Sequence, residues 1–171
     1  NNTNSDCWAM EQMEHTAYVE PSLDAVDHYN RYEEDIRLMA KAGLNAYRFS
    51  VEWARIEPEE GRFDEEQIEH YRKVIRCCKE NGIEPIVTLS HFEMPLHLCL
   101  KYNGWTDRRL IAYFVRFAET VFEAFHGEVK YWITFNEIDA TVHIPLTGAG
   151  IIREKTENME KACYQALHHQ F

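Results

Sequence analysis

The stretch Asp64–His91, DEEQIEHYRKVIRCCKENGIEPIVTLSH, indicates the fold class of the chain. Up to Asn81 its apolar residues recur at the three- and four-residue spacing of a helix. Gly82 then supplies the left-handed residue that commonly ends a helix. The following run, Glu84–His91, is short and rich in β-branched residues, as strands are. The sequence thus predicts a helix, a glycine stop and a strand in close succession.

Two further copies of this unit flank the first. They are helix Tyr29–Ala42 with Gly43 and strand Asn45–Val51, and helix Asp107–His126 with Gly127 and strand Val129–Glu137. Thr106 is the expected N-cap of the third helix, and a fourth helix is expected from about Thr156. Alternation of helices and strands predicts a parallel sheet covered by helices.

Two parallel-sheet architectures fit this order, an eight-stranded barrel and an open doubly wound sheet. No GxGxxG or GxxxxGK[ST] pattern follows any of the strands, which weakens the nucleotide-binding open sheet. The connections after the strands, Glu52–Arg62, Phe92–Trp105 and Ile138–Lys155, are long, while those before the strands are short. This asymmetry favours a (β/α)8 barrel, whose active-site loops gather at the carboxyl ends of its strands.

A barrel needs about 250 residues, so the 171 residues of this chain supply only part of one. We expect residues 1–171 to be a single domain, a catalytic barrel truncated at both ends. The net charge of −11 argues against nucleic acid as a partner, because binding phosphates needs a basic face. No apolar run approaches a membrane span. Five cysteines, an odd number without a CxxC pair, suggest reduced thiols in the cytoplasm.

The third predicted strand ends in Asn136 and Glu137, at the mouth of the expected barrel. A carboxylic acid there can protonate a leaving oxygen while the neighbouring amide holds a sugar hydroxyl. A capping or salt-bridging glutamate is the alternative. Strict alternation puts the two side chains on opposite faces of the strand, so they share a site only if the strand is irregular at its end.

Arg48 shares one face of the first strand with Ala46 and Ser50, and this face is expected to point into the barrel. An unpaired charge inside a barrel is costly, so Arg48 needs an anionic partner or an anionic substrate group. A structural ion pair and a functional contact remain open for it.

His91 ends the second strand, where its ring can donate to a sugar hydroxyl. The alternative is a buried, hydrogen-bonded histidine. A metal site made of His91, Glu93 and His97 is not expected, because their spacing differs from HExxH and Pro95 argues against a helix there.

Together these runs resemble glycoside hydrolase family 1, whose fold is the (β/α)8 barrel. The matching stretches are Asp27–Asp35 (DHYNRYEED), Asn45–Pro58 (NAYRFSVEWARIEP), Gly82–Pro95 (GIEPIVTLSHFEMP), Gly104-Trp105 and Lys130–Glu137 (KYWITFNE). The resemblance implies a β-glycosidase that retains anomeric configuration, with a small-molecule β-glucoside as its partner and no metal or other cofactor.

The resemblance also implies roles for four residues. It makes Glu137 the catalytic acid/base and Asn136 the contact of the substrate's 2-hydroxyl. His91 becomes a second sugar-hydroxyl contact, and Arg48 the partner of the nucleophilic glutamate.

The runs Leu89–Leu98 and Leu146–Gln170 resemble the 6-phospho-β-glucosidases of the family, which suits a cytoplasmic protein. An unphosphorylated β-glucosidase or β-galactosidase of the same family is one alternative, and an inactive fragment or carbohydrate-binding remnant is another. The family's opening strand, its I/VTENG nucleophile motif and its phosphate-binding loop have no counterpart here. Thr156-Glu157-Asn158 is not that motif, because it opens a predicted helix. The isolated chain is therefore expected to be inactive.

Overall fold

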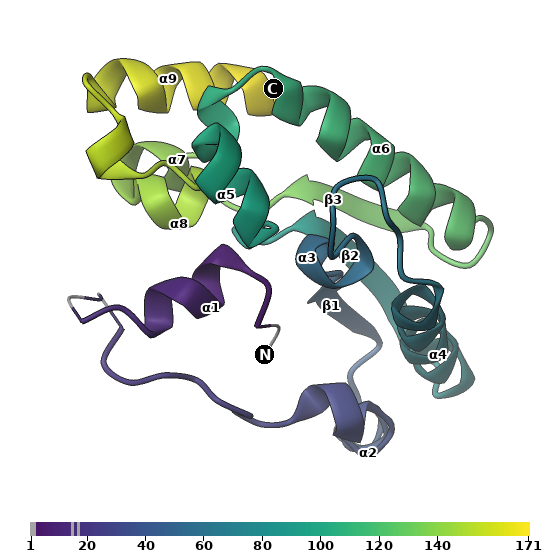
Figure 1. Cartoon of the computed structure of the whole chain (residues 1–171). Helices are drawn as coiled ribbons and strands as arrows, with labels where there is room; N and C mark the ends of the chain where they lie inside the picture. The colour runs from purple at the N-terminus through teal and green to yellow at the C-terminus, as the bar shows by residue number, and fades with distance from the viewer. Residues whose placement is uncertain (1–2, 15, 17) are drawn as a thin grey trace.

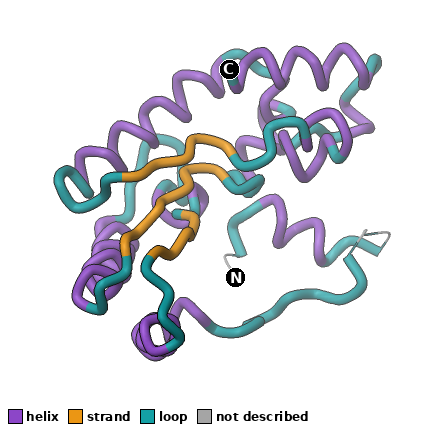
Figure 2. Tube along the Cα trace, turned by 180° about the vertical axis from the view of Figure 1, so that it is seen from behind, coloured by secondary structure: helices purple, strands orange, loops and turns teal. Residues whose placement is uncertain are grey.

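The structure is a computed structural model that describes residues 3–14, 16 and 18–171. Its sheet consists of β1 (Ala46–Ser50), β2 (Glu84–Ser90) and β3 (Tyr131–Phe135), arranged side by side in the order β1-β2-β3 (Figure 2). Both pairings are parallel, with Ser50 opposite Thr88 and Ser90 opposite Phe135. The predicted α/β fold with three parallel strands is confirmed.

A long helix precedes each strand (Figure 1). The three helices are α2 (His28–Lys41), α4 (Glu65–Glu80) and α6 (Arg109–Ala124). The predicted apolar faces of α4 and α6 are buried, whereas on α2 only Ile36 is fully buried. The glycines that follow these helices have φ angles of +84°, +71° and +73°, so each helix does end at a left-handed residue.

The start of α6 differs from the expectation. The Thr106 hydroxyl donates to the carbonyl of Asn103 and does not cap the helix. The carboxylate of Asp107 instead accepts from the N–H of Arg109, the first helical residue. Both threonine and aspartate can cap a helix. Thr106 is instead the last residue of the 3-10 turn η1 (Gly104–Thr106), which precedes α6.

Short helices occupy the connections and the chain ends. They are α1 (Asp6–Glu11), α3 (Trp53–Ile56), α5 (Leu96–Tyr102), α7 (Ala140–His143), α8 (Pro145–Ala149), the 3-10 turn η2 (Arg153–Lys155) and α9 (Met159–Gln170). The expectation that Pro95 prevents a helix was wrong, because α5 begins directly after it and a proline is tolerated there. The predicted fourth helix is present, but α9 begins at Met159, three residues later than expected, with Asn158 as its cap.

An aromatic cluster forms the centre of the core. Trp53, Phe117 and Phe114 pack with ring centroids 5.3 to 6.0 Å apart, and the ring of Phe114 stacks on Phe135 at 4.7 Å. The ring of Trp105 meets Phe135 edge-on at 5.4 Å. Phe135 is the last residue of β3, so this cluster fixes the backbone immediately before the Asn-Glu pair.

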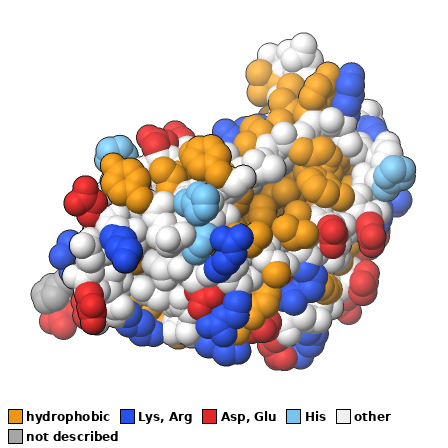
Figure 3. All heavy atoms as spheres, turned by 90° about the horizontal axis from the view of Figure 1, so that it is seen from above, with side chains coloured by type: hydrophobic (Ala, Val, Ile, Leu, Met, Phe, Trp, Pro, Cys, Tyr) orange, Lys and Arg blue, Asp and Glu red, His pale blue; other side chains and the backbone are white. Residues whose placement is uncertain are grey.

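Large apolar side chains also remain on the surface. Figure 3 looks onto the side of α6 and α9 and shows apolar side chains gathered there among charged ones. Val115, Phe122, Tyr164 and Phe171 of this region are exposed. Half-covered helix faces are expected when a chain supplies only part of a barrel. No helix in the described part of the chain has both the length and the apolar character required to cross a membrane.

Candidate active site

The backbone of β3 becomes irregular where the Asn-Glu pair begins. The N–H of Asn136 still donates to the carbonyl of Ser90, at 2.9 Å. Glu137 then adopts a φ of +38°, which is uncommon for a residue other than glycine. Strained residues of this kind cost about 1–3 kcal/mol and cluster at functional sites. The irregularity that the two side chains require in order to share one site is therefore present.

Arg48 links all three strands. Its Nε donates to Thr88 Oγ1 of β2 at 2.9 Å, and its Nη2 donates to Asn136 Oδ1 after β3 at 2.6 Å. The opposite face of β1 packs against the helices through Tyr47 and Phe49, as the alternation predicted. Within the described residues no carboxylate forms an ion pair with Arg48, whose side chain is exposed. A structural ion pair inside this chain therefore does not explain the charge.

His91 follows β2 and lies within the electrostatic reach of both neighbouring strand ends. Partial burial and then the positive charge of Arg48 lower the pKa of His91, while the negative charge of Glu137 raises it. The residue is exposed, so a buried histidine is the wrong interpretation in this chain. Arg48, His91, Asn136 and Glu137 thus come together at the carboxyl end of the sheet.

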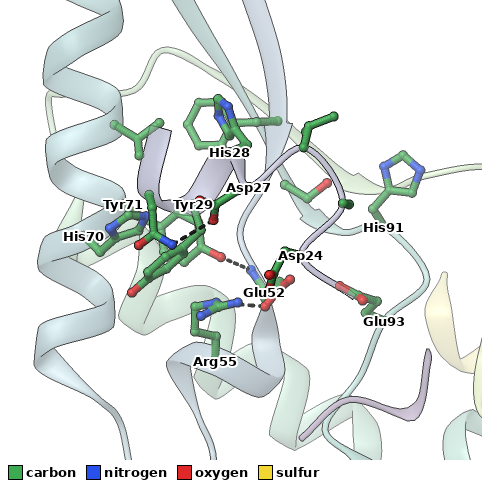
Figure 4. A pocket seen from close by; sticks show the side chains of 16 residues that line it. Asp24, Asp27, His28, Tyr29, Glu52, Arg55, His70, Tyr71, His91 and Glu93 are labelled. Atoms are coloured by element: carbon green, nitrogen blue, oxygen red, sulfur yellow. Dashed lines mark hydrogen bonds and ion pairs between the residues drawn. The ribbon is translucent and has the colours of Figure 1, made fainter. Parts of the chain in front are cut away.

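A cavity of about 520 Å³ lies beside His91 (Figure 4). Glu52 and Arg55, which line this cavity, form an ion pair of 2.9 Å. Glu93 also lines the cavity, on the same side as His91 (Figure 4). Burial, then the negative charges of Glu52 and Asp6, raise the pKa of Glu93 to about 8. A raised pKa favours the protonated form of Glu93, which can donate a hydrogen bond.

Glu52 and Arg55 were not among the candidate site residues predicted from the sequence, and Glu93 was considered only as a metal ligand. The signal that could have found Glu52 and Glu93 is their position two and three residues beyond strand ends, where barrel enzymes carry functional groups. Across the described part of the chain, no three histidine, cysteine, aspartate or glutamate side chains are arranged to hold a metal ion.

Comparison with known proteins places these residues in a family. The model of Glycosyl hydrolase family 1 matches residues 2–171. The chain is 49% identical over 152 residues to the 6-phospho-beta-glucosidase AscB of Escherichia coli (strain K12). The aligned stretch covers 88% of this chain and 32% of AscB. It is 52% identical over 114 residues to Beta-glucosidase 34 of Oryza sativa subsp. japonica. Here the aligned stretch covers 66% of this chain and 22% of the rice protein.

Solved structures agree with the sequence match. The family 1 b-glucosidase from Thermotoga maritima superposes with a TM-score of 0.86 at 32% identity, over 97% of this chain and 37% of that one. The chain thus spans about a third of the length of the bacterial curated relatives it matches. Its three parallel strands and their helices correspond to part of a family 1 TIM barrel, as predicted. The chain belongs to glycosyl hydrolase family 1.

Proposed function

We propose that this chain supplies the acid/base side of the active site of a retaining β-glycosidase that hydrolyses β-glucosides. The main support is the contact of 2.6 Å between Arg48 Nη2 and Asn136 Oδ1, which joins the middle of β1 to the residue that follows β3. The charges of both Arg48 and Glu137 act on the pKa of His91. Four polar side chains of the types that bind and cleave glycosides therefore share one edge of the sheet.

Retention requires two carboxyl groups about 5–5.5 Å apart, one acting as nucleophile and one as acid and then base. Glu137 takes the second role. It protonates the leaving oxygen when the glycosyl-enzyme forms, and it removes a proton from the attacking water when that intermediate is hydrolysed. The nucleophile is not in this chain. Arg48 is exposed and has no carboxylate partner among the described residues, so it is suited to pair with the nucleophile.

Asn136 and His91 hold the sugar. Because the carbonyl oxygen of Asn136 accepts from Arg48, its Nδ2 remains to donate to the 2-hydroxyl of the substrate. Hydrogen bonds to this hydroxyl strengthen in the transition state of glycoside cleavage. His91 donates to a neighbouring hydroxyl from the end of the middle strand.

We propose 6-phospho-β-glucosides as the substrates, in the cytoplasm. The support is the identity to AscB and the likeness of Leu89–Leu98 and Leu146–Gln170 to enzymes of that specificity. The 52% identity to a rice β-glucosidase favours the second candidate, an unphosphorylated β-glucoside. Activity of the complete barrel on matched aryl β-glucosides with and without a 6-phosphate distinguishes the two. Faster cleavage without the phosphate would contradict the first.

The variant Glu137→Gln tests the acid/base role in the complete barrel. It keeps the shape of the side chain and removes the transferable proton, so kcat/KM on disaccharides should fall by about 10²–10⁴. Activated aryl glycosides need less protonation and should lose far less. Added azide should restore turnover and yield the β-glycosyl azide, because two inversions give net retention.

Glu123→Gln is the matched control, an exposed glutamate on α6 that should leave kcat/KM unchanged. Equal losses on disaccharides and aryl glycosides, without an azide effect, would assign Glu137 a structural role. The isolated 171-residue chain should show background turnover, since it carries one of the two carboxyl groups. Trapping a glycosyl-enzyme on it with a fluorosugar would contradict the assignment.

A further inference from the structure

The segment that carries His91 is a short span between two fixed points. At one end, Ser90 closes β2 and pairs with Phe135 and with the N–H of Asn136. At the other end, Met94 is 1% exposed and packs against Gly150, where an added Cβ would lie 2.6 Å from the Met94 sulfur. Only three residues, 91–93, connect these points. The direction of the His91 ring therefore depends on how Met94 is held.

Asp6 holds Met94 through both its backbone and its side chain. The N–H of Asp6 donates to the Met94 carbonyl at 3.1 Å, and the N–H of Met94 donates to Asp6 Oδ1 at 3.0 Å. The N–H of Leu96 donates to the carbonyl of Asn4 at 2.9 Å, and Ser5 forms an antiparallel bridge with Pro95. The start of α1 thus lies beside the start of α5 (Figure 1).

The span between the fixed points is strained. Phe92 has a φ of +76°, in the left-handed region that a bulky side chain rarely adopts. Such a conformation persists only where the surroundings determine it. The rings of His91 and Phe92 also meet edge-to-face with centroids 5.1 Å apart, so a change at Phe92 moves the histidine.

Helix capping alone does not account for Asp6, whose Oδ1 also accepts from the N–H of Cys7 in the first turn of α1, at 2.8 Å. Ser5 already caps α1, since its side chain accepts from the N–H of Trp8. Stability alone does not account for it either. Asp6 is 1% exposed and its Oδ2 has no hydrogen-bond partner among the described residues, which costs free energy in a buried group.

We propose that Asp6 is a positioning residue, whose carboxyl group fixes Met94 and thereby aims His91 at the edge of the sheet where Arg48 and Glu137 lie. The identity of His91 as a sugar contact rests on the proposed function, whereas its placement by Asp6 does not. The carboxyl group acts through the backbone and touches no substrate.

The first test follows the ring signals of His91 by NMR during pH titration of the 171-residue chain. In Asp6→Ala the ring should move away from Arg48 and from the groups that partly desolvate it, so its pKa should rise toward the ordinary value of 6.5. Asp64→Ala is the control, because it removes the cap of α4 and costs about 1 kcal/mol without contacting the span. An unchanged His91 pKa in Asp6→Ala, or an equal shift in Asp64→Ala, would overturn the proposal.

The second test uses conservative variants, since Asp6→Ala removes a buried acceptor and destabilises the chain. Burial raises the pKa of Asp6 to about 7, so the His91 signals of the parent chain should show a second inflection near that pH. Glu93, Cys7, Cys99 and Tyr18 also face Asp6, and Glu93 titrates nearby at about 8. The inflection should disappear in Asp6→Asn and remain in Glu93→Gln. Its loss in Glu93→Gln alone, or its absence from the parent, would refute the assignment.

A double-mutant cycle in the complete barrel then links placement to activity. Asp6→Ala should lower kcat/KM by about tenfold or more in the parent and by less than about twofold in a His91→Ala background. Equal losses in both backgrounds would show that Asp6 acts on stability and not through His91. A parent barrel that cleaves no β-glucoside would refute the proposed function, and the two NMR tests would still decide the role of Asp6.

Discussion

The connections after β2 and after β3 both carry candidate site residues, and both place a residue other than glycine at positive φ. Phe92 has a φ of +76° and Glu137 a φ of +38°. Their supports differ in kind. The Asn-Glu pair follows Phe135, which is held by the rings of Trp105 and Phe114. The His91 span is held by the carboxyl group of Asp6. Aromatic packing does not titrate, whereas a buried carboxyl group does, so the two halves of one site should respond differently to pH.

The largest expected effect comes from removing the aromatic support. Phe114→Ala leaves a cavity beneath Phe135 and should lower the free energy of unfolding by about 3–5 kcal/mol. Urea unfolding at pH 5.5 and pH 8 should give the same loss, because no ionisable group is removed. Phe122→Ala, on the exposed side of the same helix, should cost less. If the loss of unfolding free energy in Phe114→Ala depended strongly on pH, the aromatic support would not differ from the carboxyl support in its response to pH.

The carboxyl groups of Glu93 in the β2 connection and of Asp6, which supports it, should instead make stability depend on pH. The pKa of Glu93 is raised from 4.5 to about 8, so the folded state holds this proton more tightly than the unfolded state. Stability is thus fully present below about pH 4.5 and falls as pH rises to about 8, by up to a few kcal/mol. Asp6, raised from 3.8 to about 7, acts with the same sign.

Glu93→Gln should flatten part of this slope in urea unfolding curves collected from pH 5 to pH 8. The part that remains belongs to Asp6. Glu80→Gln, an exposed change on α4, should leave the parent curve intact. A Glu93→Gln curve that falls as steeply as the parent curve would show that Glu93 does not titrate in this range.

The smallest expected effect concerns the electrostatic coupling between the two halves of the site, the residues that follow β2 and those that follow β3. Arg48→Gln removes a positive charge that lowers the His91 pKa, so this pKa should rise. Glu137→Gln removes a negative charge that raises it, so the pKa should fall. NMR titration of the His91 ring measures both. Shifts of the same sign would mean that the three groups do not share one electrostatic environment.

The parts of the fold that follow from local rules could be predicted from the sequence. Glycine stops and apolar periodicity located three helices and strands, and alternation correctly placed Arg48 on the face of β1 opposite the helices. Local rules were weaker where two neighbouring residues compete for one role. Thr106 and Asp107 are both residue types that can cap a helix, but Thr106 lies in the 3-10 turn and only Asp107 accepts from a backbone N–H of α6.

Contacts between distant segments could not be predicted in this way. The carboxyl group of Asp6 reaches a backbone N–H that lies 88 positions further along the chain, and no periodicity encodes such a pairing. The same holds for Glu93, whose raised pKa depends on burial by segments far from it in the sequence. The candidate site residues His91, Asn136 and Glu137 could be singled out from the sequence because they follow strand ends, whereas the contacts that support them could not.

The separation of Asp6 and Met94 also has a consequence for synthesis of the protein. Chains grow at about 5–20 residues per second, so the 88 positions between them take about 4–18 s to make. During this interval the beginning of α1 lacks Met94 and α5, beside which it lies in the folded chain. The span after β2 acquires its final shape only when Asp6, which is made early, contacts Met94, which is made later. A chaperone that covers the first residues of α1 would therefore delay the placement of His91, without touching the strand that carries it.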